Sequence, residues 1–107
     1  MELENIVMEL IIQSGEARSN SMEALRCARQ QKWEDAERLL AAATASIRDA
    51  HHIQTSLIGE DEGCGKIPVN LILVHAQDHL MNAMLCRELA EEILFLHREL
   101  AALKTAK

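Results

Sequence analysis

Residues 69–103 are the most informative about the fold, with the sequence VNLILVHAQDHLMNAMLCRELAEEILFLHRELAAL. It contains no glycine or proline, and its apolar residues recur at spacings of three and four, the pattern of a helix packed lengthwise on others. The seam it predicts consists of Val69, Ile72, Ala76, His79, Ala83, Cys86, Ala90, Ile93, His97 and Leu100. We therefore expect a helix over residues 69–103, followed by a basic end at Lys104 and Lys107 that suits a helix C-terminus.

The same segment carries a second stripe, which we define as Leu71, His75, Asp78, Asn82, Leu85, Leu89 and Leu96. At 100° per residue these positions fall within about one quarter of the helix circumference. One small bundle cannot bury both faces, and a helix that is apolar over most of its circumference is normally buried on most sides. The second stripe therefore predicts that copies of the chain associate along this helix. A monomer that leaves these leucines exposed is the simpler alternative.

Two earlier segments show the same periodicity. In residues 3–30 the seam is Leu3, Val7, Leu10, Ser14, Ala17, Ser21, Ala24 and Ala28, and in residues 33–58 it is Trp33, Ala36, Leu40, Ala43, Ile47, Ala50, Gln54 and Leu57. Helices joined by short connections normally lie antiparallel to their neighbours. The predicted fold class is all-α, an antiparallel up-down-up three-helix bundle that forms one domain over residues 1–107.

Composition limits the function classes. The 107 residues suit one domain, and the 49% of hydrophobic residues include only two aromatic ones, which favours an aliphatic helical core. A net charge of −6 with scattered basic residues argues against a nucleic-acid partner. Neither a signal peptide nor an apolar run of about 18 residues is present, and the cysteines are widely spaced. We expect a cytoplasmic protein without membrane insertion.

The polar residues of the second stripe are the candidates for chemistry. His75, Asp78 and Asn82 lie at i, i+3 and i+7 and share one face among leucines. Burying an imidazole or a carboxylate costs free energy unless the group has a partner, and function is one reason to accept that cost. A single helical histidine is more often structural than catalytic. His75 and His79 could also bind zinc together with Asp78, but the sequence does not place a third strong ligand.

Residues 71–81, LILVHAQDHLM, resemble the phosphorylation-site segment of the lactose/cellobiose-type enzyme IIA family of the sugar phosphotransferase system. Residues 9–18, ELIIQSGEAR, are similar to that family's first helix, and residues 50–58, AHHIQTSLI, to the end of its second. The resemblance covers essentially the whole chain. The run VHAQDHLM over residues 74–81 is far more specific than a spacing of one or two residue types.

The resemblance implies a phosphocarrier. In the family, a histidine on the third helix receives a phosphoryl group from the histidine-containing phosphocarrier protein and passes it to a cysteine of the cognate IIB component, for uptake of a β-linked disaccharide of the cellobiose, chitobiose or lactose type. By position that histidine is His75. Phosphoryl transfer depends largely on positioning and charge stabilisation, so one well-placed imidazole on a helical scaffold can suffice. Gln77 and His79 flank the site, and His79 also lies on the predicted seam.

The resemblance further implies a homotrimer in which Asp78 points at the three-fold axis and three copies hold a magnesium ion. Periodicity places Asp78 on the same face. A three-fold axis beside the second stripe would bring three Asp78 carboxylates together, and their repulsion would have to be relieved by a cation or by protons. Two alternative hypotheses remain. One is a non-enzymatic helical oligomerisation and interaction module in which His75 is only a polar interface residue, and the other is a dedicated metal-binding bundle.

Overall fold

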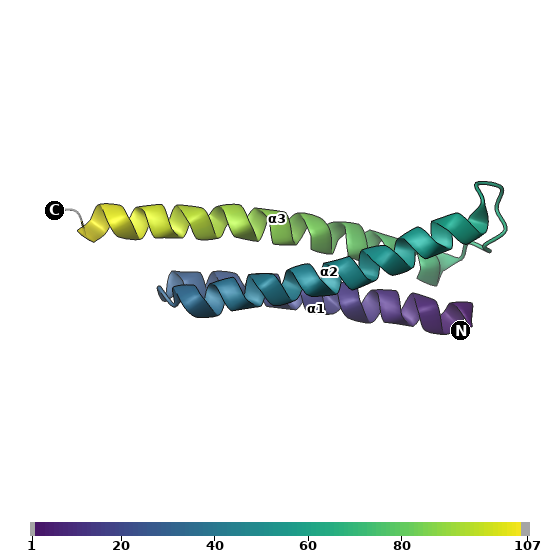
Figure 1. Cartoon of the computed structure of the whole chain (residues 1–107), viewed down its shortest axis with the longest axis horizontal. Coiled ribbons are helices and arrows are strands. Elements are labelled where there is room, and N and C mark those ends of the chain that lie inside the picture. Colours follow the sequence, from purple (N-terminus) through teal and green to yellow (C-terminus); the bar gives the residue numbers. More distant parts are fainter. Residues whose placement is uncertain (1, 106–107) are drawn as a thin grey trace.

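The structure is a computed structural model that describes residues 2–105 as three α-helices. α1 spans Leu3–Arg29, α2 spans Trp33–Asp61 and α3 spans Leu71–Thr105. They run up, down and up in an elongated bundle of 62 × 20 × 19 Å (Figure 1). The prediction of an all-α, antiparallel three-helix bundle is confirmed.

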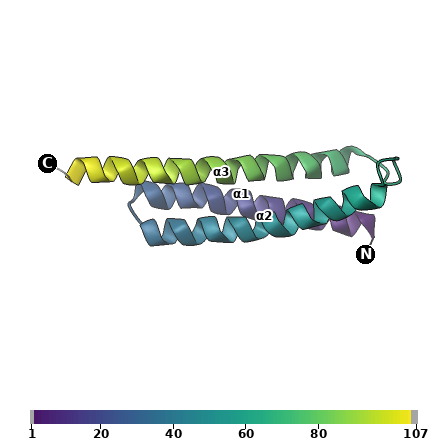
Figure 2. The same ribbon diagram turned by 45° about the horizontal axis from the view of Figure 1, so that its top comes forward.

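α1 is the helix on which the other two pack. It contacts both α2 and α3 extensively, whereas α2 and α3 contact each other less, and Figure 2 shows α1 running between them over much of the bundle. The predicted seam of α1 is buried at Val7, Leu10, Ser14, Ala17, Ser21, Ala24 and Ala28. Most of these side chains are small, which lets the helices approach closely. Ala17, Ala43 and Ala83 form one such layer, with one residue from each helix.

The seam of α2 also lies where the spacing predicts. Ala36, Leu40, Ala43, Ala50 and Leu57 are buried, while Trp33, Ile47 and Gln54 are half-buried. Near the start of α2, a guanidinium from α3 contacts two side chains of α2. Arg98 lies over the ring of Trp33, 5.5 Å from its centroid, and its Nη2 is 3.3 Å from Oε1 of Glu37.

α3 buries a different set of residues from the predicted one. Its buried side chains are Leu73, Ala76, Leu80, Ala83, Ala90 and Leu94. The predicted seam was right for Ala76, Ala83 and Ala90 and wrong for Val69, Ile72, Ile93 and Leu100, which are exposed. Because α3 is apolar around most of its circumference, its spacing is compatible with more than one seam. Packing against α1 selects the arc that contains Leu73, Leu80 and Leu94.

α3 begins at Leu71, two residues later than predicted, because Asn70 caps it. The side-chain Oδ1 of Asn70 accepts a hydrogen bond of 3.0 Å from the backbone N–H of Leu73, and its carbonyl accepts one from Val74. Pro68 just before the cap disfavours helical backbone at Ile67. An Asx cap of this kind satisfies N–H groups that a helix start otherwise leaves unpaired.

The connection between α2 and α3, residues 62–70, is held by Asp61 at the end of α2. Its carboxylate accepts hydrogen bonds from the backbone N–H groups of Gly65 and Ile67, at 3.3 and 2.9 Å. Gly63 and Gly65 have φ angles of +68° and +78°, a region that glycine enters without strain. The connection is therefore a defined turn at the end of the bundle where α3 begins.

Candidate functional site

The second stripe lies on the face of α3 that points away from the bundle core. All seven of its residues, Leu71, His75, Asp78, Asn82, Leu85, Leu89 and Leu96, are exposed. Leu71 exposes 88% of its surface and Leu96 exposes 61%. Apolar surface that is continuous along a helix is typical of an interaction site. As predicted, a single bundle does not bury this face.

The polar residues of the stripe, His75, Asp78 and Asn82, lie on the second to fourth turns of α3. His75 and Asp78 are exposed, and Asp78 accepts a hydrogen bond of 3.2 Å on Oδ2 from Nδ2 of Asn82. The rings of His75 and His79 meet edge to face, with their centroids 5.7 Å apart. The helix thus pairs His75 with His79 and Asp78 with Asn82, each over one turn. An imidazole in this position is open to a second protein.

His79 joins the site to α1. It is half-buried, and its Nε2 lies 4.0 Å from the place where a Cβ would stand at Gly15 of α1. A Cβ at this position would be in ordinary van der Waals contact with the imidazole, so the ring packs over α1 beside Gly15. His79 is therefore the partly buried histidine that its place on the seam predicted, and it supports the exposed ring of His75 from below.

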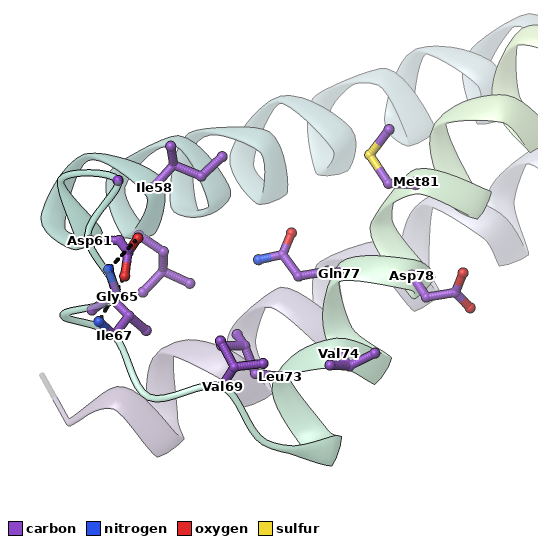
Figure 3. A pocket seen from close by; sticks show the side chains of 12 residues that line it. Ile58, Asp61, Gly65, Ile67, Val69, Leu73, Val74, Gln77, Asp78 and Met81 are labelled. Atoms are coloured by element: carbon purple, nitrogen blue, oxygen red, sulfur yellow. Dashed lines mark hydrogen bonds between the residues drawn. The ribbon is translucent and has the colours of Figure 1, made fainter.

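An open groove of about 570 Å³ lies beside Asp78, between the end of α2, the 62–70 connection and the start of α3 (Figure 3). It is lined by Leu57, Ile58, Asp61, Gly63, Gly65, Ile67, Val69, Leu73, Val74, Gln77, Asp78 and Met81. Most of these residues are apolar. Such a groove suits side chains from a protein surface better than a sugar, whose hydroxyl groups need polar partners.

Gln77 crosses this groove towards α2 (Figure 3). Its Oε1 accepts a hydrogen bond from Nε2 of Gln54, and the same nitrogen lies 3.9 Å from Sδ of Met81. The sequence placed Gln54 on the seam of α2 but gave no signal that it reaches Gln77, because 23 positions separate the two residues along the chain. This bond ties α2 to α3 at the residue directly before Asp78.

The residues present fit the magnesium ion that the resemblance implies. Asp78 is exposed on the stripe, its Oδ2 is oriented by Asn82, and a carboxylate has lone pairs for further partners on its second oxygen. Oxygen ligands of this kind suit magnesium. Within residues 2–105 no group of three His, Cys, Asp or Glu from one chain could hold a metal ion. An axial site would instead take one Asp78 from each of three copies.

Known proteins resemble this chain along nearly its whole length. The model of the family described as "PTS system, Lactose/Cellobiose specific IIA subunit" matches residues 5–98. The chain belongs to this family. The match includes the whole of the HAQDH segment and the Gly15 and Gln54 positions described above, so the prediction of a phosphotransferase IIA component is confirmed.

Relatives within the family act in several sugar branches. The "PTS system N,N'-diacetylchitobiose-specific EIIA component" of Escherichia coli is 48% identical over 101 residues, which cover 94% of this chain and 87% of that protein. The "Lichenan-specific phosphotransferase enzyme IIA component" of Bacillus subtilis is 40% identical over 99 residues, which cover 92% of this chain and 90% of that protein.

Two solved structures share the fold. The crystal structure of the PTS cellobiose-specific enzyme IIA from Bacillus anthracis is 44% identical, covers 95% of this chain and 94% of its own, and superposes with a TM-score of 0.90. The solution structure of the Escherichia coli IIA(chitobiose)–HPr complex contains a chain that is 46% identical, with a TM-score of 0.83, and the match covers 94% of this chain and 98% of that one. That family member thus binds HPr.

Proposed function

We propose that this IIA subunit carries a phosphoryl group on His75, which it accepts from the histidine-containing phosphocarrier protein HPr and passes to a cognate IIB component. The observation that carries the proposal is the exposed imidazole of His75 on the outer face of α3, within a chain that belongs to the IIA family. Among residues 2–105 His51 and His52 are also exposed, but they lie on α2 and not on the second stripe. A protein donor can reach His75 without any opening of the bundle.

The transfer is a displacement at phosphorus. One ring nitrogen of His75 attacks the phosphoryl group on the donor histidine, the donor N–P bond breaks, a new N–P bond forms, and the proton released by His75 returns to the donor imidazole. The second transfer repeats the step, since a cysteine thiolate of IIB attacks phosphorus and the imidazole of His75 leaves and takes a proton. Because the N–P bond is formed and broken between imidazoles in the first step, little driving force is needed, and positioning carries most of the rate.

The scaffold supports this chemistry by holding the imidazole still. His75 lies on a regular helix whose opposite face is anchored in the core by Ala76 and Leu80. The edge-to-face contact with the ring of His79 limits the orientations open to His75. We expect the groove beside Asp78 to receive apolar side chains of the docking proteins or of a neighbouring subunit.

The assembled form in this proposal is a homotrimer built along the second stripe. Three-fold association would cover the exposed leucines and bring three Asp78 carboxylates to one axis. Asp78 would hold a magnesium ion there, with Asn82 as the hydrogen-bond donor that orients each carboxylate. The ion would supply positive charge that relieves the repulsion between carboxylates.

The proposal places the subunit in the cytoplasm, where HPr is available, and in a branch for a β-linked disaccharide. No helix within residues 2–105 has the length and apolarity needed to span a membrane. The sugar class rests on relatives named for chitobiose, lichenan, lactose and cellobiose. Among these we favour the chitobiose type, since the chitobiose relative shares 48% identity, whereas the lactose and cellobiose relatives share 38% and 37%.

The deciding experiment is phosphoryl transfer from phosphoenolpyruvate through enzyme I and HPr to the purified chain, followed by mass spectrometry at alkaline pH and an acid challenge. One acid-labile phosphate on the wild type and none on His75→Ala supports the proposal. His79→Ala is the matched control, and we expect it to retain the modification, with a slower rate.

Two results would overturn this assignment. Phosphate on His75→Ala would place the acceptor elsewhere. No phosphate on the wild type, with a donor system that modifies a known IIA protein in parallel, would favour the interaction module. Sugar class is tested separately, by adding the phosphorylated chain to the chitobiose and cellobiose IIB components and following loss of its phosphate.

A further inference from the structure

Two half-buried side-chain amides meet across the groove beside Asp78. Nε2 of Gln54 on α2 donates a hydrogen bond to Oε1 of Gln77 on α3, and the same nitrogen lies 3.9 Å from Sδ of Met81. A thioether sulfur accepts hydrogen bonds but has no hydrogen to donate, so the end of the Gln54 amide that faces it is the nitrogen. The contact with Met81 therefore fixes the direction in which Gln54 points its donor.

The orientation of Gln77 follows from that of Gln54. A side-chain amide has one acceptor oxygen and one nitrogen with two N–H donors. Because Oε1 of Gln77 accepts from Gln54, its Nε2 is turned into the groove, towards the 62–70 connection (Figure 3). The other described side chains that line the groove are apolar or, at Asp61 and Asp78, carboxylates. Gln77 thus supplies the side-chain N–H groups of this surface.

The groove and His75 lie on opposite sides of Asp78. At 100° per residue, His75 stands about 60° to one side of Asp78, whereas Val74, Met81 and Gln77 stand about 40°, 60° and 100° to the other. In the homotrimer of the proposed function Asp78 points at the axis, and the copies follow one another around it in the same sense. The His75 side of each copy then faces the groove of the next. A protein docked on one imidazole also reaches a neighbouring groove.

The direction of the Gln77 amide matters because the incoming protein carries a phosphoryl group. Its oxygens are negatively charged acceptors, which N–H donors attract and other acceptor oxygens repel. Asp61 and Asp78 already place carboxylates at the groove. An outward oxygen on Gln77 would add a further acceptor, whereas its outward N–H groups offset the carboxylates.

We propose that Gln54 is a positioning residue for phosphoryl transfer. It holds the oxygen of Gln77 against α2, so that the N–H groups of Gln77 stay in the groove and donate to an oxygen of incoming phosphorylated HPr. This inference rests on the phosphorylation of His75 and on the homotrimer of the proposed function. It adds a residue on α2 that acts only through Gln77.

The orientation is tested by two substitutions of opposite hydrogen-bonding character. Gln54→Glu offers only acceptors, so Gln77 must turn its N–H groups towards α2 and its oxygen into the groove. Its kcat/KM for transfer from phosphorylated HPr should fall about tenfold or more, since the lost hydrogen bond has a charged acceptor. Gln54→Lys offers only donors, keeps Gln77 as it is, and should transfer several times faster than Gln54→Glu. Equal losses in both variants would overturn the inference, because loss of the α2–α3 link alone would explain them.

A double-mutant comparison shows whether Gln54 acts through Gln77. In Gln77→Met no amide remains to be oriented, so adding Gln54→Glu should lower the rate little further. The same loss in both backgrounds would be an effect of the new charge and would refute the inference. Thr55→Glu is the matched charge control, since Thr55 is exposed and does not line the groove. It should transfer like the wild type, and a loss as large as that of Gln54→Glu would also refute the inference.

Circular dichroism establishes that each variant is folded. If Gln54→Glu is not, Gln77→Glu replaces it in the comparison. A glutamate at this position still accepts from Gln54 and presents its second oxygen to the groove, so transfer should fall further than in Gln77→Met, which has no oxygen there. Transfer by Gln77→Glu at the wild-type rate would overturn the inference.

Titration calorimetry with unphosphorylated HPr identifies the acceptor oxygen. If Gln54→Glu loses as much affinity as rate, the acceptor belongs to HPr itself, and if its affinity is unchanged, the acceptor is the phosphoryl group. Both results support the role of Gln54. Absence of phosphate on the wild type would refute the proposed function together with this inference. A phosphorylated wild type and an equally fast Gln54→Glu would refute the inference alone.

Discussion

The two ends of the exposed face of α3 differ in chemistry. Near the start of the helix the face carries His75, Asp78 and Asn82, whereas from Leu85 to Leu103 its seam is aliphatic. The residues of the second stripe in both parts are exposed. Burying an aliphatic face against another copy carries no desolvation penalty, whereas burying a histidine and an aspartate does. The presence of these two residues at one end therefore indicates a role other than subunit association. One helix face can therefore be divided between chemistry and assembly.

The phase of the seam also changes between the two parts. From Leu85 to Leu89 and from Leu89 to Ile93 the spacing is four in both cases, where a strict heptad would alternate four with three. An insertion of this kind locally unwinds a coiled coil. We expect the polar and the aliphatic parts to pack with slightly different twist.

The largest expected effect is the loss of activity in His75→Ala. Phosphate acceptance should fall to zero, because the only proposed nucleophile is gone. Since His75 is exposed, the free energy of unfolding should change by no more than about 0.5 kcal/mol. Phosphorylation assays and circular dichroism during urea unfolding measure the two quantities. A variant that loses its helical content would show that His75 has a structural role, like the residues of the aliphatic part.

The next largest effect is expected from a charge in the aliphatic part. Leu89→Glu would bury carboxylates without partners at the subunit contact and cost about 3 kcal/mol or more per chain. Sedimentation velocity should show a shift from trimer to monomer. Ala102→Glu, exposed but off the seam, is the control and should remain a trimer. If Leu89→Glu stays trimeric, the seam lies elsewhere on the chain.

Asp78→Leu makes the polar part resemble the aliphatic part. It removes clustered negative charge and adds apolar contact, so the trimer should persist with a free energy of unfolding that rises by about 1–4 kcal/mol. Magnesium measured by elemental analysis after dialysis should drop to background. Dissociation of this variant into monomers would mean that assembly needs the metal. It would contradict the assignment of assembly to the aliphatic part of α3 alone.

A smaller effect is expected from Asn70→Ala. The substitution removes the cap on the backbone N–H of Leu73 and should cost about 1 kcal/mol, while Asn70→Asp, which keeps an acceptor, should cost less. Thermal unfolding monitored by circular dichroism compares the two variants. Because the cap lies next to the polar part, hydrogen exchange should rise in residues 71–76 and stay unchanged in the aliphatic part. A uniform rise along α3 would indicate that the helix unfolds as one unit.

Much of the fold could be predicted from the sequence because α1 and α2 each have one narrow seam. Every predicted position from Val7 to Ala28 is buried, and the seam of α2 holds from Trp33 to Leu57. The rest of the surface of α1 and α2 is polar enough that the spacing of three and four residues identifies only one buried face on each helix. The same count of 100° per residue predicted that His75 and Asp78 lie on an unburied face, because α1 and α2 do not cover that side of α3.

For α3 the sequence determined that two apolar faces exist, and the tertiary structure decided which one is the core. Periodicity measures how apolar residues are distributed around a helix, and on a helix that is apolar almost all round it cannot choose between Ile72 and Leu73. Contact with α1 makes that choice, as it does for the Gln54–Gln77 bond and for His79 over Gly15. These features depend on distances between helices, which spacing along one chain does not encode.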